Sequence, residues 1–221
     1  MHSTFSDGKL TIPQLVDLYG SRGFGAIAIT DHLCETDTIV GQAAKHLGRT
    51  LTEATFSLYM EILRSEAERA WKLYRMVLIP GIELTKNSIS NHRSAHILAL
   101  GITGYLSANG DVAAIAKSVR ATGALAIAAH PVSTRKVEKQ TYHLWDRREE
   151  LADAFDAWEV ASGPFIFDEV LNSGLPMIAT SDLHDPKQIT SWKTVFECER
   201  HPLAILDAIR KQELGFEFYD G

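Results

Sequence analysis

The sequence contains only two cysteines among its 221 residues, Cys34 and Cys198. Two cysteines exclude a disulfide framework and favour a reduced, cytoplasmic location. No apolar run approaches the about 18 residues that span a bilayer, and no signal peptide is visible, so we expect no membrane partner. The formal net charge is −6. This charge argues against a stable nucleic-acid complex formed through a basic face.

Repeats, low-complexity tracts and linkers are also missing, and residues 1–221 are therefore interpreted as a single domain. Short apolar runs alternate with amphipathic stretches along the chain. The runs at 26–31, 76–83, 95–102, 124–129, 156–160 and 176–181 predict strands, and 11–24, 52–75 and 111–123 predict helices. Strands that alternate with helices predict a parallel sheet, either open or closed into a barrel.

Nine histidines are present, and most of them fall where a predicted strand ends. Carboxylates occupy the same kind of position, and one histidine, His96, instead lies early in its strand. Because parallel strands place their sites at their carboxyl ends, we expect these side chains to gather at one edge. The candidate metal ligands are His2, Asp7, His32, Glu83, His96, His130, Glu159, Asp182 and His184.

Imidazole and carboxylate together suit Zn, Mn or Fe. Nine ligands are too many for one ion, so two or three ions with a bridging carboxylate are expected. Each residue also has a simpler interpretation, since a lone histidine is more often structural and Asp7–Gly8 is a common turn. Glu83 and Glu159 are harder to dismiss, because a buried carboxylate needs a partner. The remaining histidines, His46, His143 and His201, are interpreted as structural.

The motifs "HSTFSDG", "ITDH", "IPGIELT", "AHILALG", "IAAHP", "WEV" and "TSDLH" occur in an order and spacing that resemble the PHP (polymerase and histidinol phosphatase) superfamily. The resemblance covers essentially the whole chain, and it is strongest to small stand-alone bacterial PHP proteins. It implies an α/β fold, a distorted (β/α)7 TIM-like barrel. It also implies a cluster of two or three divalent metal ions and the hydrolysis of phosphate esters.

The resemblance also implies how the ligands are shared. One site would use His2, Glu83 and Asp182. A second would share Glu83 and add His96 and His130, with Glu159 nearby. A third would use Asp7, His32 and His184.

The expected mechanism follows from the charge of the ions. A metal-bound hydroxide would attack phosphorus, with Glu83, Asp182 and His184 as the catalytic residues. His184 or the third ion would stabilise or protonate the leaving oxygen. Asp31 would orient a ligand histidine or cap the following segment. The candidate binding residues for a small phosphorylated substrate are Arg93, Arg135, Lys136 and Lys187.

The chain departs from the family pattern at its start. The family opens with a strand that ends in His-x-His, and only the second histidine, His2, is present here. Relative to that pattern we expect the domain to be truncated at its N-terminus and to lack its first strand. A start assigned too late and a real truncation are both compatible with the sequence, and the first is favoured. We then expect a further histidine just upstream of Met1.

The function expected from these observations is a metal-dependent phosphoesterase. Its substrate would be a small phosphorylated metabolite, a nucleotide or an oligonucleotide end. The alternatives are a non-catalytic PHP module that binds metal or a protein partner, and a histidinol-phosphate phosphatase. The sequence identifies neither the substrate, nor the metal, nor the oligomeric state.

Overall fold

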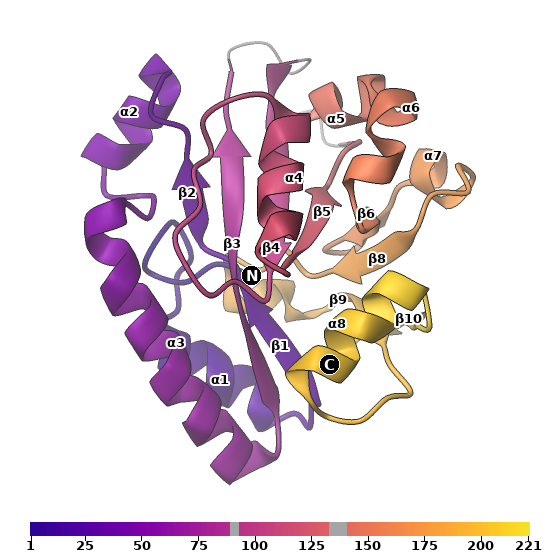
Figure 1. Cartoon of the computed structure of the whole chain (residues 1–221). Helices are drawn as coiled ribbons and strands as arrows, with labels where there is room; N and C mark the ends of the chain where they lie inside the picture. The colour runs from indigo at the N-terminus through magenta and orange to yellow at the C-terminus, as the bar shows by residue number, and fades with distance from the viewer. Residues whose placement is uncertain (89–92, 133–140) are drawn as a thin grey trace.

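A curled β-sheet with helices packed against it forms the body of the molecule (Figure 1). The computed structural model describes residues 1–88, 93–132 and 141–221. The strands of the main sheet are β1 (Ala26–Ile29), β2 (His32–Cys34), β3 (Val77–Lys86), β4 (Ala95–Leu100), β5 (Leu125–Ala129), β6 (Ala157–Ser162), β7 (Phe165–Ile166) and β8 (Met177–Thr180). A separate antiparallel pair consists of β9 (Ser191–Val195) and β10 (Gly215–Tyr219).

Helices occupy most of the connections between strands. The α-helices are α1 (Ile12–Gly20), α2 (Ile39–His46), α3 (Glu53–Tyr74), α4 (Val112–Ala121), α5 (Tyr142–Asp146), α6 (Arg148–Leu151), α7 (Asp168–Leu171) and α8 (Pro202–Lys211). The described residues also include the 3-10 turns η2 (Ala152–Ala154) and η3 (Pro186–Ile189). Thr11, Thr52 and Asp111 each accept a backbone N–H and so begin α1, α3 and α4, close to where the sequence predicts these helices. No helix within the described ranges is both long and apolar enough to cross a bilayer.

The strand directions differ from the all-parallel sheet that the sequence predicts. β3 pairs in parallel with β1 and β2, whereas β4 is antiparallel to both β3 and β5. β5, β6 and β8 are again parallel. In the reversed strand β4 the first residues lie beside the last residues of its neighbours. The early position of His96 therefore places it at the same edge as the other candidate ligands.

The sheet is a partial barrel. Its order is β1-β3-β4-β5-β6, with β8 beside β6, and no ladder joins β1 to β8 among the described residues. The structure thus confirms an α/β fold with a curled sheet, and the regular (β/α)7 pattern is not confirmed.

Both faces of the sheet are buried, because alternate residues of each strand point to opposite sides. Leu78 and Ile97 belong to the outer core beneath the helices, whereas Val77, Ile79 and Leu98 line the concave face. Following β3 in steps of two along the concave side leads from Val77 and Ile79 to Glu83. The same alternation that builds the inner core therefore presents Glu83 at the carboxyl end.

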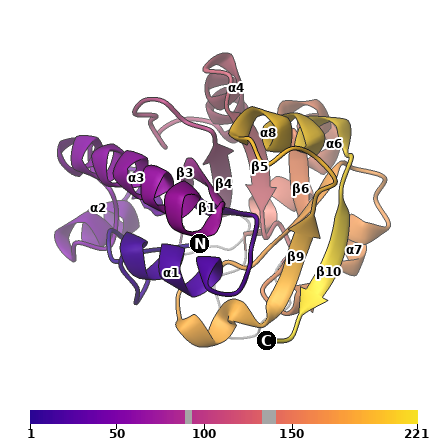
Figure 2. The same ribbon diagram turned by 90° about the horizontal axis from the view of Figure 1, so that it is seen from below.

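Helix α8 packs across the concave face at the end opposite the candidate ligands (Figures 1 and 2). Its residues Ile205, Leu206 and Ile209 join the inner core with Val77 and Leu125, which begin their strands. The N-cap of this helix is His201, whose Nδ1 accepts the N–H of Leu203. This capping role fits the structural interpretation of His201.

We expect that truncating a leucine on the buried side of α8 destabilises the fold. Leu206 is 5% exposed, so L206A should lower the free energy of unfolding by ~2–5 kcal/mol through lost burial and a residual cavity. Leu203 on the same helix is 68% exposed, and L203A should change the free energy of unfolding by less than about 0.5 kcal/mol. Urea unfolding of both variants measures the difference, and equal losses would contradict this packing.

Candidate metal centre

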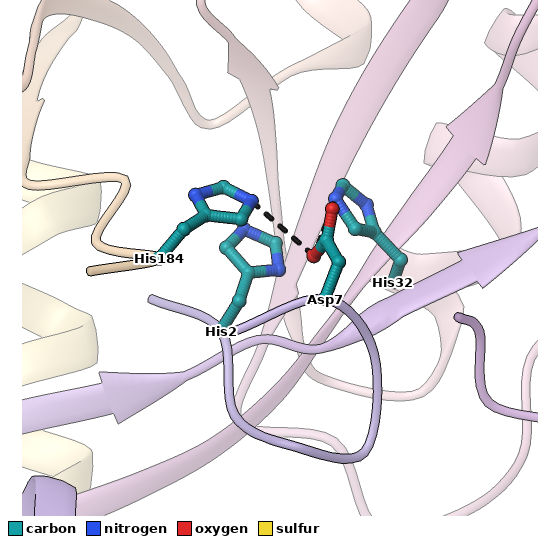
Figure 3. A group of neighbouring side chains, drawn as sticks. All are labelled: His2, Asp7, His32 and His184. Atoms are coloured by element: carbon teal, nitrogen blue, oxygen red, sulfur yellow. Dashed lines mark ion pairs between the residues drawn. The ribbon is translucent and has the colours of Figure 1, made fainter. Parts of the chain in front are cut away.

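The candidate ligands converge at the carboxyl edge of the sheet. Glu83 lies in β3, His130 directly follows β5, and Asp182 follows β8 by two residues. The antiparallel strand β4 brings His96 opposite Thr85 of β3, which lies two residues after Glu83 on the same strand. His2 and Asp7 come from the loop at the start of the chain, and Figure 3 shows them facing His32 and His184.

Eight of the nine predicted ligands form three overlapping groups, in each of which the ligand atoms lie within 4.8 Å of one another. The "Asp7 group" is His2, Asp7, His32 and His184. The "Asp182 group" is His2, Glu83 and Asp182, and the "His130 group" is Glu83, His96 and His130. His2 is shared by the first two groups and Glu83 by the last two. The three groups therefore form one continuous cluster.

The carboxylate of Glu83 presents one oxygen to each of its two groups. Oε2 lies 3.3 Å from His2 Nε2, and Oε1 lies 2.7 Å from His96 Nδ1. Glu83 itself is only 1% exposed. A carboxylate that presents its two oxygens in this way has the arrangement of a bridging ligand between two neighbouring ions.

Three of the histidines have one ring nitrogen held by an oxygen atom outside the cluster. His32 Nδ1 lies 2.8 Å from the Thr85 hydroxyl, which donates its own proton to the Glu83 carbonyl. His96 Nε2 lies 3.2 Å from Asn87 Oδ1. A proton on the nitrogen that faces Thr85 or Asn87 would leave the other ring nitrogen free as a ligand.

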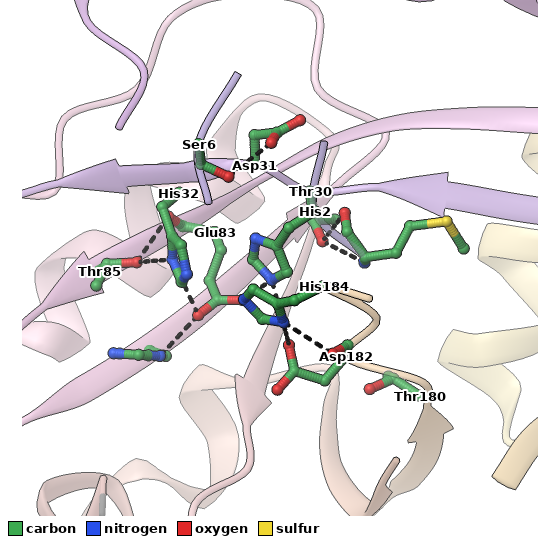
Figure 4. Close-up of polar contacts among 12 residues, drawn as sticks. His2, Ser6, Thr30, Asp31, His32, Glu83, Thr85, Thr180, Asp182 and His184 are labelled. Carbon is green, nitrogen blue, oxygen red and sulfur yellow. Dashed lines mark hydrogen bonds and ion pairs between the residues drawn. The ribbon is translucent and has the colours of Figure 1, made fainter. Parts of the chain in front are cut away.

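His184 follows the same rule. Its Nδ1 lies 3.0 Å from the backbone carbonyl of Asp182 (Figure 4), and its Nε2 lies 3.3 Å from Asp7 Oδ1 (Figure 3). Sequence reasoning did not identify Thr85 and Asn87 as partners. Thr85 had a recognisable signal, since it lies two residues after Glu83 and shares its face of the strand. Asn87 lies beyond the strand, where no periodicity applies.

Several buried polar atoms in the cluster have no hydrogen-bond partner among the residues that the structure describes. They are both ring nitrogens of His2, Oε1 of Glu83 and Nδ1 of His130. Unpartnered polar atoms are costly in a protein interior, and native structures rarely keep them without a reason. Divalent cations in the three groups would satisfy such atoms, so the side chains present fit metal ions.

Buried histidines of the metal-free cluster have pKa values far from the ordinary value of a histidine. Burial lowers the pKa of His2, but the neighbouring carboxylates of Asp182 and Glu83 raise it to about 9. Burial also lowers the pKa of His130, but the carboxylates of Glu159, Asp182 and Glu83 raise it to about 10. Burial and the positive charge of His2 lower the pKa of His32 to about 3. Without metal, protons on His2 and His130 thus supply the positive charge that the carboxylates need.

Two of the ligands have a left-handed backbone. φ is +28° at His130 and +44° at Asp182, a region that non-glycine residues seldom adopt. Backbone strain of this kind is typical of functional sites and persists only where neighbouring contacts hold it.

Glu159 belongs to none of the three groups, although the sequence suggested it as a ligand. It is buried, and its Oε2 accepts the backbone N–H of His130 at 2.6 Å. Its Oε1 accepts the Thr180 hydroxyl at 2.7 Å. Both carboxylate oxygens therefore have protein donors, and the geometry favours a role in holding His130 over a role as a ligand.

Among the described residues, the Asp31 carboxylate makes no direct hydrogen bond to a ligand histidine and caps no helix, in contrast to the expectation from the sequence. Its carboxylate instead accepts hydrogen bonds from Ser3 and Ser6. The reason is that the N-terminal loop folds over the end of β1, a contact that spacing alone does not reveal.

The candidate phosphate-binding residues are placed only in part. Arg93 and Lys187 are exposed, and each lies three residues from a candidate ligand, His96 and His184 respectively. Arg135 and Lys136 lie outside the described residues. Among the remaining histidines, His143 contacts Arg147 and His46 is exposed on α2, and neither is part of the three groups.

No model of a known protein family matches the chain, and no curated protein matches it in sequence. Solved structures do match its fold. One is a two-domain protein from Bacteroides vulgatus containing a predicted PHP-like metal-dependent phosphoesterase, with 23% identity and a TM-score of 0.68. The match covers 99% of this chain and 63% of that one. Another is an amidohydrolase from Chromobacterium violaceum with bound sulfate and no metal, with 18% identity and a TM-score of 0.50.

That second match covers 84% of this chain and 86% of the amidohydrolase. At these identities the likeness concerns the fold. The PHP-like fold that the motifs suggest is therefore supported by structure, and the chain spans less than two thirds of the Bacteroides protein.

We expect the stability gap between metal-loaded and metal-free protein to widen with pH. A histidine whose folded pKa is raised stabilises the fold below its ordinary pKa of about 6.5, and loses that contribution as pH rises through its folded value. In the metal-free protein the pKa values of His2 and His130 are about 9 and 10. Their contribution to stability is therefore lost between pH 6.5 and 10. Melting curves with EDTA and with Mn²⁺ measure the gap, and a constant gap would contradict the charge balance.

Variants of Glu159 separate the two roles of its carboxylate. E159A should lower the free energy of unfolding by ~1–3 kcal/mol, because it leaves the buried donors on His130 and Thr180 unsatisfied. E159Q keeps an acceptor for the His130 N–H and should retain the wild-type metal content. If E159Q folds normally but loses an ion, that result would show that the Glu159 carboxylate is a metal ligand. Urea unfolding and metal analysis of dialysed protein provide both readouts.

Proposed function

We propose that this chain is a metal-dependent hydrolase that cleaves phosphate esters. The observation that carries the proposal is the continuous cluster in which His2 and Glu83 are each shared by two groups of ligands. Neighbouring ions that share a ligand suit the in-line displacement at phosphorus, where an attacking and a leaving oxygen both need charge stabilisation. The description of the Bacteroides vulgatus protein as containing a predicted metal-dependent phosphoesterase supports this reaction class.

Two or three divalent ions, of Zn, Mn or Fe, would be held by the three groups. Histidine nitrogen and carboxylate oxygen, with no cysteine among the ligands, suit these ions. When bound, they lower the pKa of water and neutralise charge on the phosphate.

The side chains of the cluster would then divide the work by position. Glu83, at 1% exposure, holds the two deeper groups together and is closed off from solvent. Asp182 and His184 are more exposed, with about 30% of each side chain accessible: 31% and 29%. These two residues therefore face the solvent from which a substrate arrives. His184, held through Nδ1 by the Asp182 carbonyl, offers Nε2 to an ion of the Asp7 group, on the side where the leaving oxygen would develop charge.

The substrate in this proposal is a small phosphorylated molecule. Arg93 and Lys187 are its candidate phosphate ligands, together with Arg135 and Lys136 beyond the described residues. Their cations would compensate the phosphate charge that the metal ions leave unbalanced.

Phosphate release from a chromogenic phosphomonoester tests the proposal. The wild-type protein should turn over this ester with Mn²⁺ or Zn²⁺ and lose activity with EDTA. D182N should lower kcat by more than about 100-fold, because it removes the charge of a ligand of the Asp182 group. H46N, at an exposed histidine of α2, is the matched control and should retain activity.

The outcomes separate two functions. A metal-loaded protein that releases no phosphate from a panel of nucleotides, sugar phosphates and the chromogenic ester would contradict the enzyme proposal. Metal content at the wild-type level in that same sample would then assign the chain to a non-catalytic metal-binding module.

A further inference from the structure

Asp31 is a fully buried carboxylate that lies between the ligand-bearing segments, and its exposure is 0%. Its Oδ1 accepts the backbone N–H of Ser3 at 2.7 Å and the hydroxyl of Ser6 at 2.6 Å, and its Oδ2 accepts the Ser3 hydroxyl at 2.7 Å. Figure 4 shows the Ser6 contact. All three donors are neutral, and together they satisfy both oxygens of an anion that would otherwise be costly to bury.

The loop that Asp31 holds, from Ser3 to Lys9, contains its own backbone hydrogen bonds. The N–H groups of Ser6 and Gly8 both donate to the Ser3 carbonyl, at 3.1 and 3.0 Å. A Cβ on Gly8 would lie 2.1 Å from the His2 carbonyl oxygen, so the loop has no room for a side chain there. Asp7, between Ser6 and Gly8, is therefore placed by its two neighbours.

The ends of this loop are tied to the segment that carries His184. The N–H of His2 donates to the Leu183 carbonyl at 2.9 Å, and the N–H of Lys9 donates to the His184 carbonyl at 2.8 Å. Asp31 itself precedes His32 in the chain. The loop and Asp31 thus connect all four members of the Asp7 group. His2 and Asp7 belong to the N-terminal segment itself, whereas His32 follows Asp31 and the His184 carbonyl accepts the N–H of Lys9.

We propose that Asp31 is a positioning residue that assembles the Asp7 group, by fixing the loop from Ser3 to Lys9 through the side chains of Ser3 and Ser6. The proposal rests on metal binding by the cluster in the proposed function. It assigns Asp31 no contact with an ion or a substrate. Its effect is selective: the His130 group, whose His96 and His130 lie outside the loop, keeps its ion when the contacts of Asp31 are removed.

Variants S6A, D31A and D31N test this role, with S21A as control. S6A removes one hydrogen bond to Asp31 and leaves the rest of the loop intact. D31N keeps the size of the side chain and can still accept at the oxygen that Ser3 N–H and Ser6 use. Ser21 is exposed, and its hydroxyl contacts only the Leu18 carbonyl among the described contacts, at 3.4 Å.

The readout is metal occupancy and not turnover. Mn²⁺ titration followed by mass-spectrometric metal analysis gives the affinity and stoichiometry, and anomalous difference maps of crystals show which group is emptied. We expect S6A to weaken the affinity of the Asp7 group by about 10-fold, D31A to weaken it further, and D31N to retain most of it. The His130 group should remain at wild-type occupancy in all of them, as should every group in S21A.

Wild-type occupancy of the Asp7 group in S6A would overturn the proposal, as would an equal loss from all groups in folded S6A. If D31A does not fold, S6A and D31N still decide the outcome. A wild-type protein that binds no Mn²⁺ would instead overturn metal binding itself, which is a distinguishable failure of the proposed function.

Discussion

The buried negative charge of Glu83 is the constraint on which the arrangement of the cluster depends. Its carboxylate lies at 1% exposure, with His2 on one oxygen and His96 on the other. A charge in such a place needs positive partners, supplied by protons in the metal-free protein and by ions in the proposed enzyme. The sheet is built to meet this need, because β3 is paired on both sides and its alternation points Glu83 into the concave face.

Around this centre the protein uses further buried carboxylates to hold the ligands. Glu159 accepts the N–H of His130, whose backbone is left-handed, and Asp31 accepts the donors of the loop that carries His2 and Asp7. Both oxygens of each carboxylate have protein donors. The ligands at the two ends of the cluster are therefore placed by hydrogen bonds from deeper in the fold, a common way to fix metal sites.

The sequence predicts which residues form the cluster better than it predicts the hydrogen bonds that hold them in place. Apolar runs ending in His or Glu mark the strand ends, and the ordered motifs point to the PHP-like fold that the structure supports. The direction of β4 could not be predicted, because hydrophobic periodicity carries no information on whether a neighbour is parallel. The early position of His96 was the one local sign of the reversed strand. The contacts of Asp31 and Asn87 depend on how loops fold over the sheet, which motif spacing does not record.

Electron paramagnetic resonance of the Mn²⁺-loaded protein tests the central claim most directly, because it detects whether ions sit in adjacent sites that share a ligand. The account predicts an exchange-coupled spectrum from neighbouring ions at saturating Mn²⁺, reduced to that of isolated ions in E83Q. A wild-type spectrum of isolated ions at saturation would contradict the shared roles of His2 and Glu83.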